Sequence, residues 1–110
     1  MLSLRIKRVN DLLKKEFGRI IFEEVDNRKG GLITVTRVET SSDLQHAKIY
    51  ISIFPEREKE RINKLLDKQI YKLQKILDKR LYMRPVPKIR LLNDLSGEKF
   101  TKINKLLNGP

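Results

Sequence analysis

The fold is decided by residues 32–54, which read LITVTRVETSSDLQHAKIYISIF. Residues 47–54 alternate between Ala or Ile and Lys, Tyr, Ser or Phe, a period of two that is typical of a half-buried strand. Residues 32–40 are rich in Thr and Val, which favours another strand, but Ile33 and Val35 fall on one face and Val38 on the other. We therefore expect a β-bulge or two partly covered faces in this first strand.

The segment between the two strands predicts a turn. Ser41, Ser42 and Asp43 are turn-forming residues, and we expect Asp43 to accept hydrogen bonds from nearby backbone N–H groups. His46 is the only histidine of the chain and is interpreted as a turn residue rather than a metal ligand. The stretch as a whole predicts a β-hairpin with a turn longer than two residues.

Helical patterns flank this hairpin. Residues 4–25 place apolar side chains at steps of three and four, and residues 56–81 do the same without an internal Gly or Pro. Pro55 ends the second strand and can begin the long helix, because its missing N–H is not needed there. Pro85 and Pro87 then impose extended backbone, residues 89–93 predict a third strand, and residues 100–107 predict a short C-terminal helix.

The order of these elements predicts the architecture. A hairpin followed by a long helix and a third strand is typical of an α+β fold in which helices pack on one face of a three-stranded sheet. With 110 residues, the chain has room for a single domain, which we expect to span residues 1–110. The predicted order is α-β-β-α-β with a short C-terminal helix.

Composition narrows the classes of function. The chain has 25 Lys and Arg against 14 Asp and Glu, a net charge of +11, which points to a polyanionic partner. It has no Cys and one His, which argues against disulfides, thiolate zinc sites and cysteine nucleophiles. No apolar run approaches the roughly 20 residues that span a bilayer, and the N-terminus lacks the apolar core of a signal peptide. We expect a soluble, cytoplasmic protein without a metal, a cofactor or a small-molecule substrate.

The positive charge is concentrated in residues 61–90, which hold ten basic and two acidic side chains. At about 100° per residue, five lysines of the long helix fall within an arc of roughly 80°, opposite its apolar residues. We call Lys64, Lys68, Lys72, Lys75 and Lys79 the lysine stripe. Because lysine is a compact point charge, the stripe favours contacts with phosphates over reading of bases.

The predicted RNA-binding residues extend this stripe. They are Lys64, Lys68, Lys72, Lys75, Lys79, Arg80, Arg84 and Arg90, with Arg5, Lys7 and Arg8 as a second edge. Two other interpretations of the charge are a solvated helix face and an amphipathic helix on an anionic membrane. The membrane is disfavoured, because a chain this small needs the apolar face of the helix for its core.

Aromatic residues offer two further expectations. Tyr50 and Phe54 share one strand face and either stack on bases or pack under a helix, of which we favour the packing. Tyr71 lies at the edge of the apolar arc and is expected to be half-buried.

Residues 38–52, VETSSDLQHAKIYIS, resemble the V-x-x-S-x-D-L-x-x-A-x-V-Y-V-S signature of the ribosome-binding factor A family. Arg8 and Val9, with Leu12 and Leu13, fit the family's opening R-V-x-x-L-I pattern. Residues 81–91 resemble its L-x-L-R-x-V-P-x-L-x-F pattern, and residues 93–96 its D-x-S turn. The resemblance extends over residues 3–107, in the family's order and spacing.

The resemblance implies a fold and a function. The family fold is a type II KH-like domain of order αββααβ, and its members bind the small ribosomal subunit and its 16S rRNA during late maturation. They support processing and docking of the 5′ region of the rRNA and growth in the cold, without enzymatic activity or a cofactor. The resemblance therefore implies a non-enzymatic assembly factor, which we expect to be a monomer.

One segment departs from the family. The A-x-G kink between two family helices aligns with Gln69-Ile70-Tyr71, which holds neither Ala nor Gly. Because Gly permits a sharp bend, we expect a continuous or gently bent helix here.

Two other functions remain open from the sequence. One is a small ribosome-dependent endoribonuclease of the toxin type, for which Tyr71, Tyr82 and Arg84 are the candidates to activate a 2′-hydroxyl group. The other is a free-standing KH-like RNA-binding module without a role on the ribosome.

Overall fold

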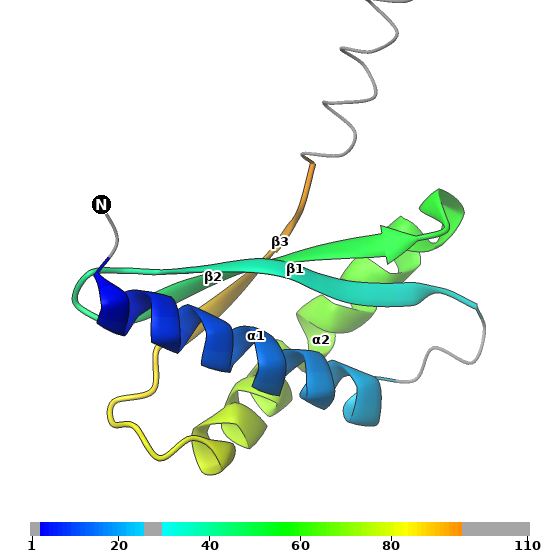
Figure 1. Cartoon of the computed structure of the whole chain (residues 1–110). Coiled ribbons are helices and arrows are strands. Elements are labelled where there is room, and N and C mark those ends of the chain that lie inside the picture. The colour runs from blue at the N-terminus through cyan, green and yellow to red at the C-terminus, as the bar shows by residue number, and fades with distance from the viewer. Residues whose placement is uncertain (1–2, 26–29, 96–110) are drawn as a thin grey trace, which may run out of the picture.

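A three-stranded mixed sheet is the centre of the molecule (Figure 1). The computed structural model describes residues 3–25 and 30–95. β1 (Leu32–Thr40) pairs antiparallel with β2 (His46–Phe54), as the hairpin prediction requires. β3 (Lys88–Asn93) pairs with β2 in parallel, so the strand order is β1-β2-β3.

The irregular pattern of β1 is a β-bulge. The register with β2 shifts between Val35 and Arg37, so Thr36 is the extra residue. An extra residue reverses the alternation of the following side chains, which returns Val38 to the buried face beside Val35. The first of the two expected explanations is thus confirmed.

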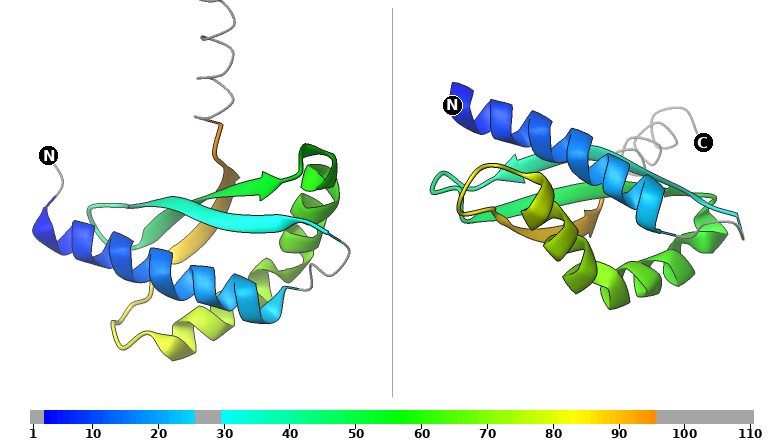
Figure 2. Two further views of the ribbon diagram at one scale, coloured as in Figure 1. Left: turned by 45° about the vertical axis from the view of Figure 1, so that its right-hand side comes forward. Right: turned by 90° about the horizontal axis from the view of Figure 1, so that it is seen from below.

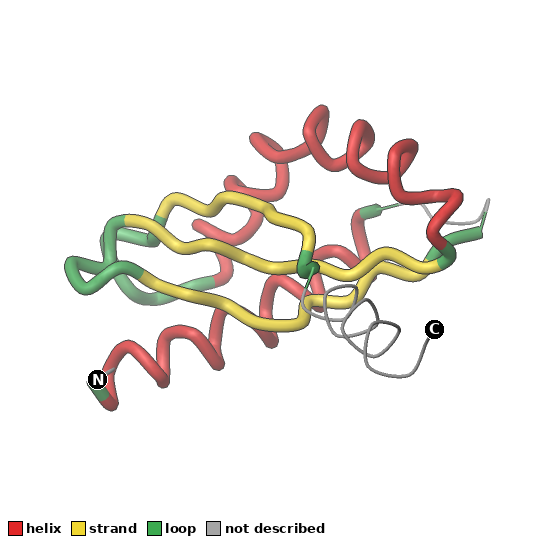
Figure 3. The backbone as a smooth tube through the Cα atoms, turned by 90° about the horizontal axis from the view of Figure 1, so that it is seen from above, coloured by secondary structure: helices red, strands yellow, loops and turns green. Residues whose placement is uncertain are grey.

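Two helices cover one face of this sheet (Figures 1 and 2). α1 (Leu4–Glu24) is capped by Ser3, whose Oγ accepts a hydrogen bond from the Ile6 N–H at 3.1 Å. α2 (Lys59–Arg80) follows the short 3₁₀ turn η1 (Glu56–Glu58). Figure 3 looks onto the opposite face, where no described helix or strand is layered on the sheet.

The observed elements follow the predicted α-β-β-α-β order. α2 is one unbroken α-helix through Gln69-Ile70-Tyr71, which confirms the expectation of a continuous helix at the place of the family kink. The short C-terminal helix predicted over residues 100–107 lies outside the described residues.

The core lies between the sheet and the helices. Its largest fully buried side chains come from both layers, with Leu13 and Phe17 from α1, Ile49 from β2, and Leu73 and Leu77 from α2. These residues belong to one continuous cluster. The apolar stripes of both predicted helices therefore face the sheet, as their periodicity indicated.

The side chain of Gln74 fastens α2 to the backbone of β3. Gln74 Oε1 accepts from the Ile89 N–H at 2.8 Å, and Gln74 Nε2 lies 3.2 Å from the Pro87 carbonyl oxygen. Further along, the amides of Asn63 and Asn93 bond to each other at 3.1 Å. Since β3 pairs with β2 on one side only, Gln74 satisfies the outward Ile89 N–H of β3, whereas the Asn63–Asn93 bond joins two side chains.

We predict that Gln74→Leu lowers the free energy of unfolding by about 1–3 kcal/mol, because it leaves the Ile89 N–H of β3 and the Pro87 carbonyl without their partner. Gln69→Leu is the matched control on the same helix, because Gln69 Oε1 is buried and has no hydrogen-bond partner among residues 3–25 and 30–95. We expect this control to be neutral or stabilising, and urea unfolding followed by circular dichroism measures both. An equal loss in the two variants would contradict the role assigned to the Gln74 hydrogen bonds.

Candidate nucleic-acid interface

The lysine stripe is exposed along its whole length. All five lysines are accessible to solvent, whereas Ile62, Leu66, Leu73 and Leu77 of the same helix are buried. α2 thus separates an apolar face that packs on the sheet from a basic face that points away from it. This arrangement confirms the helical placement of the lysines.

Not every lysine of the stripe is free of acidic partners. Lys64 Nζ lies 3.4 Å from Glu60 Oε1, and Lys72 Nζ lies 3.6 Å from Glu24 Oε1. Lys75 Nζ lies 6.0 Å from the centroid of the Tyr71 ring. The remaining two lysines of the stripe have no ion pair within the described part of the chain. Exposed ion pairs contribute little, so Lys64 and Lys72 remain able to exchange their carboxylates for phosphates.

Arg80 is engaged in holding the two helices together. Its guanidinium nitrogens lie 3.3 and 3.0 Å from the two carboxylate oxygens of Glu23 at the end of α1. The hydrogen bond to Arg80 lowers the pKa of Glu23, and the same bond raises the pKa of Arg80. A phosphate of RNA would therefore have to displace the Glu23 carboxylate from the Arg80 guanidinium, which binds both carboxylate oxygens.

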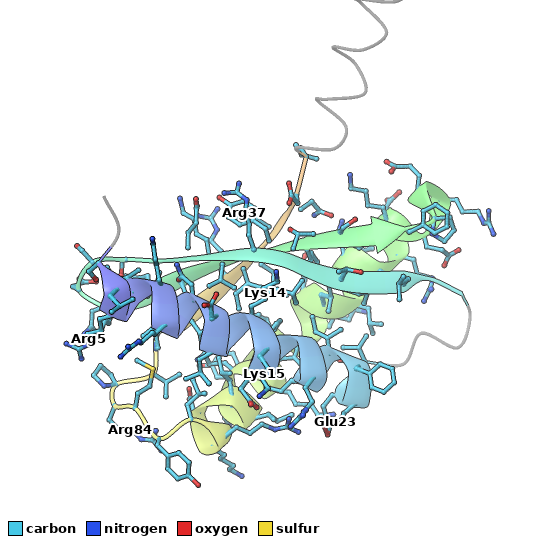
Figure 4. All side chains as sticks on the ribbon, viewed as in Figure 1. Arg5, Lys14, Lys15, Glu23, Arg37 and Arg84 are labelled. Atoms are coloured by element: carbon cyan, nitrogen blue, oxygen red, sulfur yellow. The ribbon has the colours of Figure 1, made fainter. Side chains whose placement is uncertain are left out.

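Arg84 lies in the connection between α2 and β3, and the N-terminal cations lie on the first turns of α1. Arg84 Nη1 donates to the carbonyl oxygens of Leu81 and Met83, both at 2.7 Å, in the connection between α2 and β3. Arg5, Lys7 and Arg8 are exposed on the first turns of α1. In the view of Figure 4, Arg5 and Arg84 lie toward the same end of the molecule, whereas Glu23 lies toward the other.

Arg90 corrects the expectation of a single basic face. Ile89 points into the core, so its neighbour Arg90 points to the uncovered side of the sheet, away from α2. Arg90 therefore belongs to a different surface from the lysine stripe. The alternation of residues 89–93 carried this signal, because Ile89 and Leu91 fall on one face of the strand and Arg90 on the other.

That uncovered surface also holds cations that are not among the predicted RNA-binding residues. Lys48 of β2 and Lys88 of β3 are exposed there beside Arg90, and Arg37 stands on β1. A hollow of about 670 Å³ is lined by residues that include His46, Lys48, Lys88 and Arg90. The strand alternation could have identified these residues once the covered face of the sheet was known.

Tyr50 and Phe54 do not pack under a helix, and the preferred interpretation of these two residues was wrong. Both point to the uncovered face of the sheet, where Phe54 is 71% exposed. The Tyr50 hydroxyl donates to Glu39 Oε1 at 3.0 Å, and this bond raises the pKa of Tyr50. The Arg37 guanidinium carbon lies 3.8 Å from the centroid of the Tyr50 ring.

The candidate nuclease residues do not form a site in the structure. Tyr71 is 79% exposed rather than half-buried, and Tyr82 is fully exposed. Arg84 donates to backbone carbonyl oxygens rather than to either tyrosine. Among the residues that the structure describes, there is no group of three potential metal ligands, and no helix is long and apolar enough to cross a membrane.

The hairpin turn is longer than two residues, as predicted, but His46, which was interpreted as a turn residue, is the first residue of β2. Asp43 Oδ1 accepts from the Ser41 hydroxyl at 2.6 Å and from the Gln45 N–H at 3.1 Å. The Ser41 hydrogen bond is the main cause that lowers the pKa of Asp43, and the Gln45 N–H adds to it. The capping role expected for Asp43 is therefore confirmed.

Comparison with known proteins places these features in a family. The family model for ribosome-binding factor A matches residues 5–107. Ribosome-binding factor A of Synechocystis sp. is 38% identical over 110 residues, covering 96% of this chain and 82% of that protein. The protein of the same name from Halothermothrix orenii is 38% identical over 107 residues, covering 94% of this chain and 85% of that protein.

Solved structures show the same architecture. The crystal structure of ribosome-binding factor A from Thermus thermophilus matches with a TM-score of 0.69 and 26% identity, covering 80% of this chain and 94% of that one. A homology model of the Thermus thermophilus protein, fitted into a cryo-electron microscopy map of a 30S complex, matches with a TM-score of 0.62 and 26% identity, over 78% and 91% of the two chains. The fold is thus the expected type II KH-like α+β arrangement.

We predict that Asp43→Asn destabilises the protein at neutral pH and that this loss shrinks as the pH falls. Because the folded state lowers the pKa of Asp43, its carboxylate stabilises the fold above the ordinary pKa of the group. This stabilisation disappears as the pH falls through the lower, folded value. Thermal unfolding from about pH 7 to about pH 3 measures the difference from the wild type. Asp67→Asn, on the exposed side of α2, is the control, and a difference for Asp43→Asn that does not change with pH would contradict the assignment.

Proposed function

Because this chain belongs to the ribosome-binding factor A family, we propose that it binds the immature small ribosomal subunit through 16S rRNA. It assists late maturation of the subunit and processing of its rRNA. It acts in the cytoplasm as a single-domain monomer, without enzymatic activity, a cofactor or a small-molecule substrate. The fitted 30S complex of the Thermus thermophilus protein supports the small subunit as the partner.

The exposed lysine stripe is the observation that carries this proposal. Lys68 and Lys79 have no acidic partner in the described residues, and Lys75 has an aromatic neighbour. A row of ammonium groups spaced along one helix neutralises successive phosphates and releases their counterions. Such contacts recognise the shape of the RNA backbone rather than its sequence.

The same contacts suggest how binding assists maturation. A protein that binds one conformation of the rRNA more tightly than another shifts the population toward the first. The stripe and the N-terminal cations of α1 supply charge for this purpose without any bond being made or broken. The proposed activity is therefore to stabilise one conformation of the rRNA for as long as the protein is bound.

We predict that reversing Lys68, Lys75 and Lys79 to Glu together abolishes co-sedimentation with immature small subunits. These three lysines are chosen because their ammonium groups make no ion pair in the described residues, so the change leaves the contacts between α1 and α2 in place. Sucrose-gradient sedimentation at two salt concentrations measures binding. The wild type is expected to lose affinity steeply with salt. The slope of log affinity against log salt should be about −1 for each phosphate contact.

The control carries the same change of charge on the other helix. Lys14, Lys15 and Arg19 are exposed on α1, and their reversal to Glu is expected to leave most of the subunit binding intact. Circular dichroism checks that both triple variants are folded. Retained binding by the α2 variant, or equal loss in both variants, would contradict the assignment to the stripe.

A further inference from the structure

The side of the sheet away from α1 and α2 carries a second set of charged side chains. No described helix or strand is layered on this side, as Figure 3 shows. Strand alternation brings side chains from β1, β2 and β3 to it. We define the open sheet face as the part of this side that carries Arg37, Glu39, His46, Lys48, Tyr50, Lys88 and Arg90.

The charges on the open sheet face are not balanced. The register places Lys48 directly beside Arg90, and Lys88 lies two residues before Arg90 on the same face of β3. Strands lie about 4.8 Å apart, and like charges directly opposite each other destabilise a sheet. Within the described residues, none of Lys48, Lys88 and Arg90 makes an ion pair. Like charges kept together without an ion-pair partner favour binding of an external anion.

The carboxylate opposite Lys48 is already occupied. Glu39 lies beside Lys48 in the register, but its two oxygens are bonded to Arg37 Nη1 at 2.9 Å and to the Tyr50 hydroxyl at 3.0 Å. Glu39 therefore holds Arg37 and Tyr50 in place and leaves Lys48 available to an external anion.

The surface between these cations is hollow. A depression of about 670 Å³ has Ala47 and Ile89 of neighbouring strands among its lining residues, with Lys48, Lys88 and Arg90 around them. Glu39 also lines this hollow, but its carboxylate oxygens are bonded to Arg37 and Tyr50, so the three cations are the lining charges left for a phosphate.

A stacking platform lies beside the hollow. The guanidinium of Arg37 lies over the Tyr50 ring at 3.8 Å, and half of the Arg37 side chain is exposed. Figure 4 shows Arg37 rising from β1 on the side away from α1. Unpaired bases stack on guanidinium planes and on aromatic rings, which an acidic protein segment would not use.

We propose that the open sheet face is a second RNA-binding surface, on which Lys48, Lys88 and Arg90 bind phosphates and the Arg37–Tyr50 pair stacks a base. Its ligand is single-stranded RNA, because stacking requires unpaired bases. This inference rests on the proposed function, which supplies rRNA as the partner. The lysine stripe and the open sheet face then contact RNA from opposite layers of the molecule.

The test combines Lys48→Gln with Arg90→Gln, which removes two charges of the surface without burying new ones. The probe is a fluorescein-labelled oligouridylate, and its fluorescence anisotropy is measured over a series of salt concentrations. The slope of log affinity against log salt is negative, and two lost single-strand phosphate contacts should make it less steep by about 1.4. Lys14→Gln with Lys15→Gln on α1 is the control, and its slope should equal that of the wild type.

A second variant tests the stacking platform. Arg37→Lys keeps the charge but removes the guanidinium plane. Loss of base stacking should weaken oligouridylate binding by about fivefold or more, with an unchanged salt slope. If Arg37 acted only through its charge, Arg37→Lys would leave the affinity unchanged, because the charge is kept.

The outcomes separate this inference from the proposed function. An unchanged affinity and slope in the Lys48 and Arg90 variant would overturn the inference. Loss of small-subunit binding with normal oligouridylate binding would assign the surface to an acidic protein segment and overturn it as well. Failure of the wild type to sediment with small subunits would refute the proposed function, while the oligouridylate slopes would still report on the open sheet face.

Discussion

One constraint shapes the rest of the molecule, which is that the two described helices cover only one face of the sheet. The apolar residues of α1 and α2 both pack against that face, where the core forms. The cations must then lie on the outer sides of the helices or on the bare side of the sheet. The two-layer fold therefore separates the positive charge into the lysine stripe and the open sheet face.

The position of β3 connects these two surfaces. The Gln74 amide of α2 bonds to the backbone on both sides of Lys88, and the parallel pairing with β2 sets the register of the strand. The same register that buries Ile89 turns Lys88 and Arg90 outward beside His46 and Lys48. The geometry of the open sheet face thus depends on a contact made by the helix on the other side of the sheet.

The elements of the fold could be predicted from the sequence because each is a local pattern. The periods of 3.6 and two residues located both helices and all three strands, and the broken alternation at Val38 indicated the bulge. The face of the sheet that the helices cover is a tertiary property, which no single strand reveals. For that reason Tyr50 and Phe54 were placed under a helix although they lie on the bare side.

The candidate site was predictable only in part for the same reason. Helical periodicity was sufficient to place the lysines of the stripe on one face of α2. It could not reveal that Arg80 is bonded to Glu23, a residue 57 positions away, or that Lys72 reaches Glu24. Such pairs depend on how two helices pack, and they decide which cations remain available to an external phosphate.

The central claim, that both layers of the molecule contact rRNA, is tested most directly by directed hydroxyl-radical cleavage. The chain has no Cys, so Ser52→Cys on the open sheet face and Tyr71→Cys beside the lysine stripe each provide one attachment point for an iron chelate. With each protein bound to the immature small subunit, we expect cleavage of 16S rRNA from both positions, at different nucleotides. Cleavage from position 71 alone would contradict the two-surface account.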